Sequence, residues 1–282
     1  MEVKLEGKLI ADEILKNLKQ GVEKLRQKGI IPTLLVVLVG DNEQSLIYIK
    51  QKELKAKEIG ARTEVLTLSD QTSFEEAKDL VAKLNSDPRT HAIIIQRPTP
   101  ASLEVEKLAN IIDPEKEIDG FGDHDLYKVP VAEATEILIR NAFEQLNKKQ
   151  TFEDWIKKQK VVVIGKGETA GLPIVNHLRL LGIDPTVIDS KTKNPKEITK
   201  KADILISAVG KDRVVTSDML KRGAILIGVG LHTDEEEKLR GDFHRDEIAD
   251  TVSFYSPTPG GVGPVNVACL MRNLVTAAEK LS

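Results

Sequence analysis

The sequence predicts an α/β protein of two domains built on parallel sheets. Its 282 residues exceed the roughly 150 residues of a typical single domain. Short, continuously apolar runs are typical of strands buried on both faces, and charged helical segments separate them. That alternation favours doubly wound parallel sheets. The expected strands are Leu34–Val39, Ala92–Ile95, Val161–Ile164, Thr186–Ile188, Ile204–Ser207 and Ala224–Ile227.

The helices between these strands suggest where the domains divide. A charge-rich helical segment, residues 132–159, interrupts the alternation and is expected to connect the two domains. A last helix starting near Val265 is expected to pack back on the first domain. The predicted domains are therefore residues 1–131 plus 264–282, and residues 132–263. The other expected helices are Ala11–Arg26, Gln44–Ile59, Ser73–Leu84, Leu172–Leu181 and Ala268–Leu281.

Composition excludes several classes of partner. A net charge of -3 and a pI near 6.0 leave no basic surface for nucleic acid. No apolar stretch approaches the roughly 18 residues of a membrane span, and the N-terminus lacks the apolar core of a signal peptide. The one cysteine, Cys269, lies in an apolar helical stretch and indicates a reducing, cytoplasmic setting. No histidine or cysteine spacing predicts a metal site.

A glycine-bearing turn follows the strand Val161–Ile164 and opens a helix. Gly165, Gly167 and Gly171 give a spacing one residue longer than the common dinucleotide fingerprint. Such glycines allow close backbone approach to phosphate, and the helix presents free N–H groups and a positive dipole end. The context favours a Rossmann-like dinucleotide site over an ordinary strand-to-helix turn.

The end of the next strand bears on the choice of dinucleotide. Asp189 stands where an acidic side chain commonly binds the ribose 2′-hydroxyl of NAD and repels the 2′-phosphate of NADP. Lys166 and Lys191 are nearby in sequence and could pair with that phosphate, so NAD and NADP both remain open. Gly210 and the segment 228–231 follow two further strands, at the edge where ligands bind in such sheets.

A second group of residues suggests a reacting site. Tyr48 and Lys52 share a helix face because four residues separate them, although a solvated surface pair has the same spacing. Gln96 ends a buried strand and is followed by two prolines that stiffen the exit. Asp119 precedes Gly120 in a turn. These side chains could stack on, protonate or hydrogen-bond a flat, polar heterocycle.

A proline- and glycine-rich loop precedes the last helix. It contains Pro259, Gly260, Gly261, Val262 and Gly263. Such a loop is rigid and carries little side-chain bulk, so a flat ligand could lie against its backbone. A purely connecting loop is the alternative.

Taken in order along the chain, these motifs resemble the bifunctional methylenetetrahydrofolate dehydrogenase/cyclohydrolase family. The resemblance implies two α/β domains with a cleft between them, the first catalytic and the second Rossmann-like, and a homodimer. The matching segments are Ser45-x-x-Tyr48-x-x-x-Lys52, Gln96-Arg97-Pro98-x-Pro100, Lys116–Phe121, Gly165–Pro173, Ser190-Lys191-Thr192, Gly241-Asp242 and Pro259–Pro264.

The resemblance also implies roles for individual residues. Lys52 would be the catalytic lysine, assisted by Gln96, while Tyr48 would stack on the folate and Asp119 would hydrogen-bond its pterin. The same four residues would bind substrate, together with Ile95, Arg97, Pro259, Gly260, Gly261, Val262 and Gly263. The dinucleotide would contact Gly165, Lys166, Gly167, Gly171, Asp189, Ser190, Gly210 and Leu231.

The activity implied is oxidation of 5,10-methylenetetrahydrofolate with NADP, or alternatively NAD, and hydrolysis of the methenyl product to 10-formyltetrahydrofolate. The family usually has arginine and serine where Lys166 and Gly167 stand, and often histidine in place of Asp189. Three other functions therefore stay open: a cyclohydrolase alone, a non-catalytic nucleotide- or folate-binding module, and a dehydrogenase of an unrelated small substrate.

Overall fold

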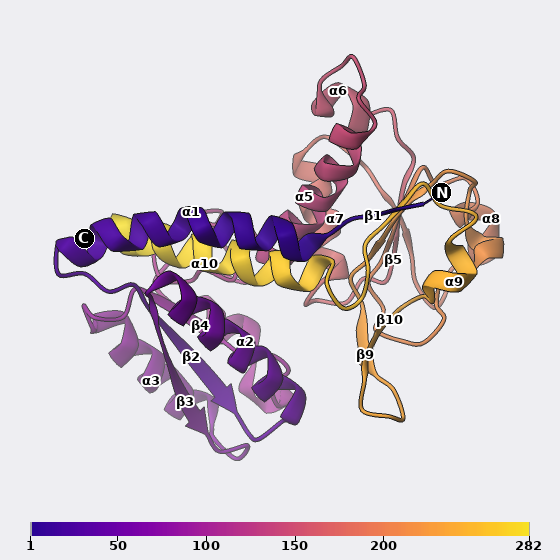
Figure 1. The fold of residues 1–282 in the computed structure, drawn as a ribbon. Helices are drawn as coiled ribbons and strands as arrows, with labels where there is room; N and C mark the ends of the chain where they lie inside the picture. Colours follow the sequence, from indigo (N-terminus) through magenta and orange to yellow (C-terminus); the bar gives the residue numbers. More distant parts are fainter. Residues whose placement is uncertain (1, 282) are drawn as a thin grey trace. The chain divides into compact units, whose positions relative to one another are not determined.

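The structure is a computed structural model that describes residues 2–281, and it divides into two compact units (Figure 1). The first unit contains Ala11–Pro130 and the residues after Asn266. The second contains the residues before Ala11 and the segment Val131–Asn266. This division differs from the expected domains at the N-terminus, because β1 (Val3–Lys4) pairs in parallel with β11 (Phe254–Tyr255) of the second unit.

The sheet of the first unit is parallel and has the order β3-β2-β4. Its central strand, β2 (Thr33–Val39), is buried at every position, as a continuous apolar run requires when helices cover both faces. β4 (Ala92–Ile95) is buried in the same way. β3 (Arg62–Leu68) alternates exposed and partly buried residues. The apolar-run criterion missed β3 because an edge strand needs only one apolar face.

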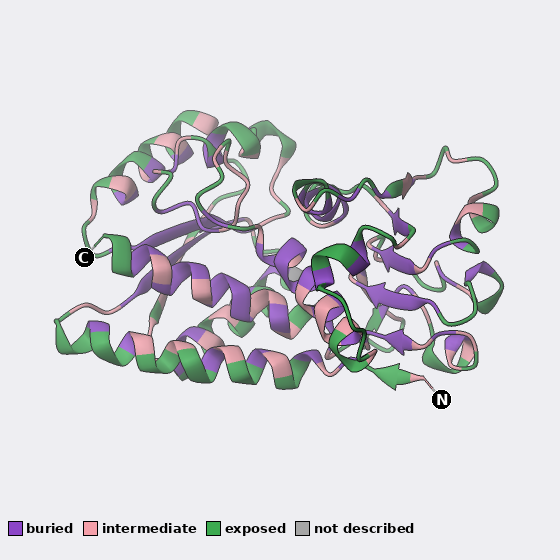
Figure 2. Ribbon diagram, turned by 90° about the horizontal axis from the view of Figure 1, so that it is seen from above, coloured by how far each residue is buried: buried purple, intermediate pink, exposed green. Residues whose placement is uncertain are grey.

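Two long helices, α1 (Gly7–Gln27) and α10 (Val262–Lys280), lie side by side in the first unit for most of their length (Figures 1 and 2). Leu15 and Val22 of α1 share one buried core with Met271 and Leu274 of α10. The last helix therefore packs on the first unit, as expected, although it begins at Val262 and not near Val265.

Side-chain caps fix the other main helices of the first unit. Asn42 accepts a hydrogen bond from the Ser45 N–H at the start of α2 (Glu43–Ile59), and Ser73 and Glu76 form a capping box at the start of α3. Such caps satisfy N–H groups that the first helical turn leaves free. The remaining elements are α3 (Phe74–Ser86), η1 (Ala101–Leu103) and α4 (Val105–Ala109).

The sheet of the second unit has the order β1-β11-β8-β7-β5-β6, and its pairings are parallel. β5 (Val161–Ile164), β7 (Ile204–Ser207) and β8 (Ile225–Gly228) are buried at every position. β6 (Thr186–Ile188) forms one edge. The strand and helix pattern confirms the predicted α/β class with parallel sheets.

The segment 132–159 folds as α5 (Pro130–Gln145) and α6 (Phe152–Ile156), which pack through the rings of Phe143, Phe152 and Trp155. The antiparallel pair β9 (Leu231–Thr233) and β10 (Leu239–Gly241), the short strands β1 and β11 and the edge strand β3 were not predicted. The second unit also holds α7 (Gly171–Leu180), α8 (Pro195–Thr199), η2 (Ser217–Met219) and α9 (Arg245–Ile248). Within residues 2–281, no helix combines the length and apolarity that a membrane span requires.

Candidate active site

A lysine and a glutamine from separate elements of the first unit form a direct hydrogen bond. Lys52 Nζ on α2 donates to Gln96 Oε1 at 2.8 Å. Gln96 follows β4, and its own N–H donates to Val37 O at 2.8 Å. Its Nε2 donates to Arg97 O at 2.7 Å, which uses the amide nitrogen and so turns the amide oxygen towards the lysine.

The surroundings of Lys52 favour its neutral form. Burial lowers the pKa of the Lys52 ammonium, and the nearby Asp119 carboxylate partly offsets that change. Gln96 accepts the hydrogen bond without adding charge. A lysine with a lowered pKa can exchange protons near neutral pH.

Asp119 lies in the turn after residues 116–118. Burial raises the pKa of the Asp119 carboxyl, and the charges of Lys52 and Arg97 act against that rise. Its N–H donates to Glu117 Oε1 at 3.1 Å, whereas its carboxylate accepts no hydrogen bond from residues 2–281. The carboxylate is therefore available to donors on a ligand.

The remaining predicted folate residues of the first unit differ in accessibility. Tyr48 is 40% exposed, and partial burial raises the pKa of its hydroxyl. The Arg97 guanidinium lies 4.2 Å from the centre of the Phe121 ring and pairs with Glu106 at 3.0 Å. The Ile95 side chain belongs to the hydrophobic core, so only its backbone is available to a ligand.

The predicted proline- and glycine-rich loop belongs to the second unit. Gly260 has a φ of 106°, which favours glycine, and a Cβ on Gly261 would lie 2.6 Å from Pro257 O. Val262 and Gly263 form the first turn of α10 and are not part of a loop. Gly7, which the sequence did not single out, packs against this segment: a Cβ there would lie 1.9 Å from Gly261 O.

The turn after β5 has the shape of an anion cradle. Gly165 has a φ of 96°, and a Cβ there would lie 2.5 Å from Ala208 O. A Cβ on Gly171 would lie 2.3 Å from Gly165 O, whereas Gly167 faces open space. Among the described residues, the N–H groups of Lys166, Gly167 and Thr169 donate no hydrogen bond. Free N–H groups in the turn that leads into α7 suit a diphosphate, so the residues present fit a dinucleotide.

An ion pair joins this turn to the end of β6. Lys166 Nζ lies 2.8 Å from Asp189 Oδ2. Asp189 Oδ1 also accepts hydrogen bonds from Lys191 N and Thr192 Oγ1, each at 3.0 Å. The Lys166 hydrogen bond is the main cause that lowers the pKa of the Asp189 carboxyl to about 2. Ser190, the next residue, is exposed.

A buried carboxylate holds the turn after β7. Asp242, which is 0% exposed, accepts hydrogen bonds from Ser207 Oγ at 2.6 Å, Val209 N at 3.0 Å, Gly210 N at 2.7 Å and Lys211 N at 3.0 Å. The Gly210 N–H is thus engaged and cannot donate to a dinucleotide.

Other contacts around this turn are between backbones. A Cβ on Gly210 would lie 2.8 Å from Leu231 O, so Gly210 and Leu231 approach closely. The Gly241-Asp242 dipeptide is one of the segments that carry the family resemblance, but the sequence does not indicate the partners of Asp242.

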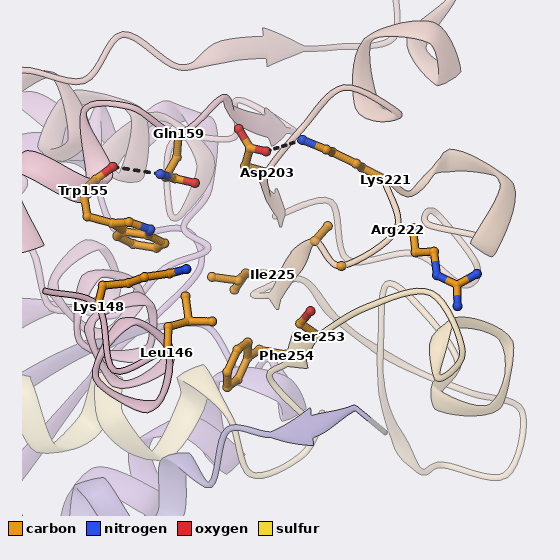
Figure 3. A pocket seen from close by; sticks show the side chains of 12 residues that line it. Leu146, Lys148, Trp155, Gln159, Asp203, Lys221, Arg222, Ile225, Ser253 and Phe254 are labelled. Atoms are coloured by element: carbon orange, nitrogen blue, oxygen red, sulfur yellow. Dashed lines mark hydrogen bonds and ion pairs between the residues drawn. The ribbon is translucent and has the colours of Figure 1, made fainter.

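A cavity of about 240 Å³ lies at the other edge of the same sheet (Figure 3). Trp155, Lys148 and Phe254 line it, and the Lys148 ammonium points inward (Figure 3). Its lining includes Asp203 and Ile225, at the amino ends of β7 and β8. Because ligands in open parallel sheets bind at the carboxyl ends of the strands, this cavity is not the dinucleotide site.

Comparisons with known proteins agree with this arrangement. Residues 5–119 match the catalytic domain of tetrahydrofolate dehydrogenase/cyclohydrolase, and residues 142–282 match the NAD(P)-binding domain of the same family. A curated relative, the bifunctional protein FolD of Lactococcus lactis subsp. cremoris, is 35% identical over 281 residues, covering 98% of this chain and 96% of the relative. The protein of the same name from Lachnoclostridium phytofermentans is 37% identical, covering 99% of each.

Solved structures show the same fold. The Campylobacter jejuni FolD methylenetetrahydrofolate dehydrogenase/cyclohydrolase superposes with a TM-score of 0.90 at 29% identity, covering 99% of both chains. The Trypanosoma brucei enzyme, solved with NADP cofactor and an inhibitor, gives 0.88 at 28% identity and covers 99% of this chain and 98% of its own. The chain belongs to the tetrahydrofolate dehydrogenase/cyclohydrolase family.

Proposed function

We propose that the protein oxidises 5,10-methylenetetrahydrofolate to the methenyl form with NAD(P)⁺ and hydrolyses the methenyl form to 10-formyltetrahydrofolate. The observation that carries the proposal is the 2.8 Å hydrogen bond from Lys52 to Gln96 next to the Asp119 carboxylate. Family membership supports both half-reactions, because the names of the relatives state dehydrogenase and cyclohydrolase activity.

The hydrolytic step follows from the chemistry of these residues. Lys52, whose pKa burial lowers, takes in its neutral form a proton from the water that attacks the methenyl carbon. As the bond from that carbon to N5 breaks, N5 gains a proton and the hydroxyl of the adduct loses one, which leaves the formyl group on N10 and one proton released overall. Gln96 orients the lysine, and Asp119 accepts hydrogen bonds from the donor-rich edge of the pterin. Tyr48 offers a flat, partly exposed ring for stacking.

The dinucleotide supplies the hydride acceptor of the oxidation. The N–H groups of Lys166, Gly167 and Thr169 would bind its diphosphate. Gly165 and Gly171 allow the tight turn itself, because a Cβ at either position would collide with the backbone oxygen of Ala208 or of Gly165. Ser190 and Leu231 follow β6 and β8 at the same carboxyl edge of the sheet.

NADP is the cofactor we propose, with NAD as a second substrate of the same site. Lys166 is 62% exposed, so it can turn from Asp189 to a 2′-phosphate. Asp189 stays ionised at neutral pH and repels that phosphate, whereas it can accept a hydrogen bond from the 2′-hydroxyl of NAD. The opposite charges of Lys166 and Asp189 together set the ratio of the NADP-dependent to the NAD-dependent activity.

Two parallel assays test the proposal. Methenyltetrahydrofolate formation, followed by absorbance with NADP and with NAD, tests the oxidation, and decay of added methenyltetrahydrofolate tests the hydrolysis. Decay without formation would favour a cyclohydrolase alone, which the altered Lys166-Gly167 pair also allows. Absence of both would favour a binding module.

Two further expectations belong to the same proposal. The family resemblance supports a homodimer, which light scattering of the purified protein would measure. The single cysteine, Cys269, is buried and takes part in no disulfide among residues 2–281, which supports a reducing, cytoplasmic setting.

A further inference from the structure

One buried carboxylate binds the backbone of the turn that carries Asp119. Glu117 is 2% exposed. Its Oε1 accepts a hydrogen bond from Asp119 N at 3.1 Å, and its Oε2 accepts from Gly120 N at 3.0 Å and Gly122 N at 3.3 Å. Three N–H groups of the turn therefore donate to a single side chain.

Other contacts of this segment lie elsewhere: Arg97 stacks on Phe121, and Asp123 N donates to Asn110 Oδ1 at 2.7 Å. Neither contact engages the three N–H groups that Glu117 binds. Gly120 has a φ of 76°, a backbone conformation that side chains disfavour, and Val129 fills the space where its Cβ would lie. On the other side, Ile95, Val105 and Ala109 present apolar groups around Glu117. Apolar groups cannot accept hydrogen bonds, so they offer no substitute for the carboxylate.

We propose that Glu117 is a positioning residue for the reaction: its carboxylate fixes the Asp119–Gly122 turn and thereby the direction in which Asp119 faces the folate and Lys52. The inference rests on the proposed function, since the contact between Asp119 and folate is part of it. It adds a residue whose own side chain touches neither the substrate nor the dinucleotide.

Ionisation of Glu117 links this positioning to pH. Burial, followed by the charge of Asp119, raises the pKa of the Glu117 carboxyl to about 7. The other charged or titratable groups around it are Arg97, which lines the same small cavity, and His124, whose Nε2 lies 3.7 Å from Glu117 Oε2. Lys116 points away, because its ammonium donates to Leu84 O, Asn85 O and Asp87 O at the end of α3.

The direction of the pH effect follows. Above about pH 7 the ionised carboxylate can accept from all three N–H groups. Below that pH, one oxygen carries a proton and becomes a poor acceptor, so the turn loses part of its support. The affinity for folate should therefore rise as pH increases through neutrality.

Glu117→Gln tests the inference, because glutamine keeps the shape but replaces one acceptor oxygen with a donor that faces the N–H groups. We expect the folate KM of the hydrolysis to rise by about tenfold or more. The increase of folate affinity through neutral pH should disappear, and the dinucleotide affinity should stay unchanged. Glu115→Gln is the matched control, since Glu115 is an exposed glutamate two residues before Glu117. If Glu117→Gln keeps both the folate KM and the pH dependence of folate affinity of the unmodified protein, the inference is overturned.

A second variant and a second measurement keep the test decisive. If Glu117→Gln does not fold, Glu117→Asp keeps the charge but withdraws both oxygens by one methylene, and an unaltered folate KM there would also overturn the inference. If the unmodified protein turns over neither methylenetetrahydrofolate nor methenyltetrahydrofolate, the proposed function fails. Equilibrium binding of tetrahydrofolate to Glu117→Gln and to the unmodified chain still decides the role of Glu117, because weaker binding supports it and equal binding contradicts it.

Discussion

Lys52 and Gln96 lie 44 residues apart in the chain, yet Lys52 Nζ donates to Gln96 Oε1 at 2.8 Å. The pairing depends on the order of the strands, because β2 lies beside β4 and the Gln96 N–H donates to Val37 O of β2. Gln96 thereby accepts the hydrogen bond of Lys52 without adding a second charge. Burial can then lower the pKa of Lys52.

Replacing Lys52 should abolish hydrolysis while leaving the fold intact. Lys52→Met keeps the aliphatic stem but removes the group that exchanges protons, so we expect turnover of methenyltetrahydrofolate to fall at least about 100-fold. Lys50→Met is the matched control, since Lys50 is exposed on the same helix. Equal losses in the two variants would point to damage to α2 rather than to lost chemistry.

Introducing a charge at Gln96 should move the pH dependence. In Gln96→Glu the new carboxylate favours the ammonium form, so the pKa of Lys52 rises from its lowered value towards that of a free lysine. The neutral lysine then forms only at higher pH, and the rising limb of the hydrolysis profile should shift to higher pH. A limb that stays in place would show that Lys52 is not the group titrating.

Removing the charge of Asp189 should favour NADP. Asp189→Ser frees Lys166 to pair with a 2′-phosphate and removes a charge that repels it, so the NADP-to-NAD ratio of kcat/KM should rise about tenfold. Steady-state kinetics with both cofactors measure the ratio. Asp184→Ser controls for surface charge, because Asp184 is 88% exposed, and it should leave the ratio unchanged.

Asp242 is expected to matter for stability. In Asp242→Asn the amide has one acceptor oxygen for a buried site that holds four donors, and its own N–H groups face those donors. We expect the free energy of unfolding of the second unit to fall by about 3 kcal/mol. Chemical denaturation measures this, with Asp246→Asn as control because Asp246 is 96% exposed. A loss below that of the control would contradict the role assigned to Asp242.

The sequence predicted the elements whose signal is local. β2, β4, β5 and β7 are continuous apolar runs, and such runs arise wherever helices cover both faces of a strand. β3 was not predicted because its residues alternate in burial and form no continuous apolar run. β1 and β11 were not predicted because a strand of two residues has no detectable periodicity.

The same distinction applies to the candidate site. The glycines of the Gly165 turn could be identified from spacing and context, whereas Tyr48 and Lys52 were singled out only by the family resemblance, since their spacing alone also fits a surface pair. Asp242 could not, because Ser207, which it binds, lies 35 residues away. The hydrogen bonds of Glu117 go to residues close to it in the chain. Its role nevertheless depends on burial of its side chain, which could not be predicted because the residues around it in the sequence are charged.

The most direct test of the account is methenyltetrahydrofolate absorbance, recorded with the unmodified protein and with Lys52→Met. The unmodified protein should form methenyltetrahydrofolate from the methylene form with NADP or NAD, and should hydrolyse it when it is supplied alone. Lys52→Met should bind both ligands but lose the hydrolysis. Hydrolysis at an equal rate in the two proteins, or its absence from the unmodified chain, would contradict the account.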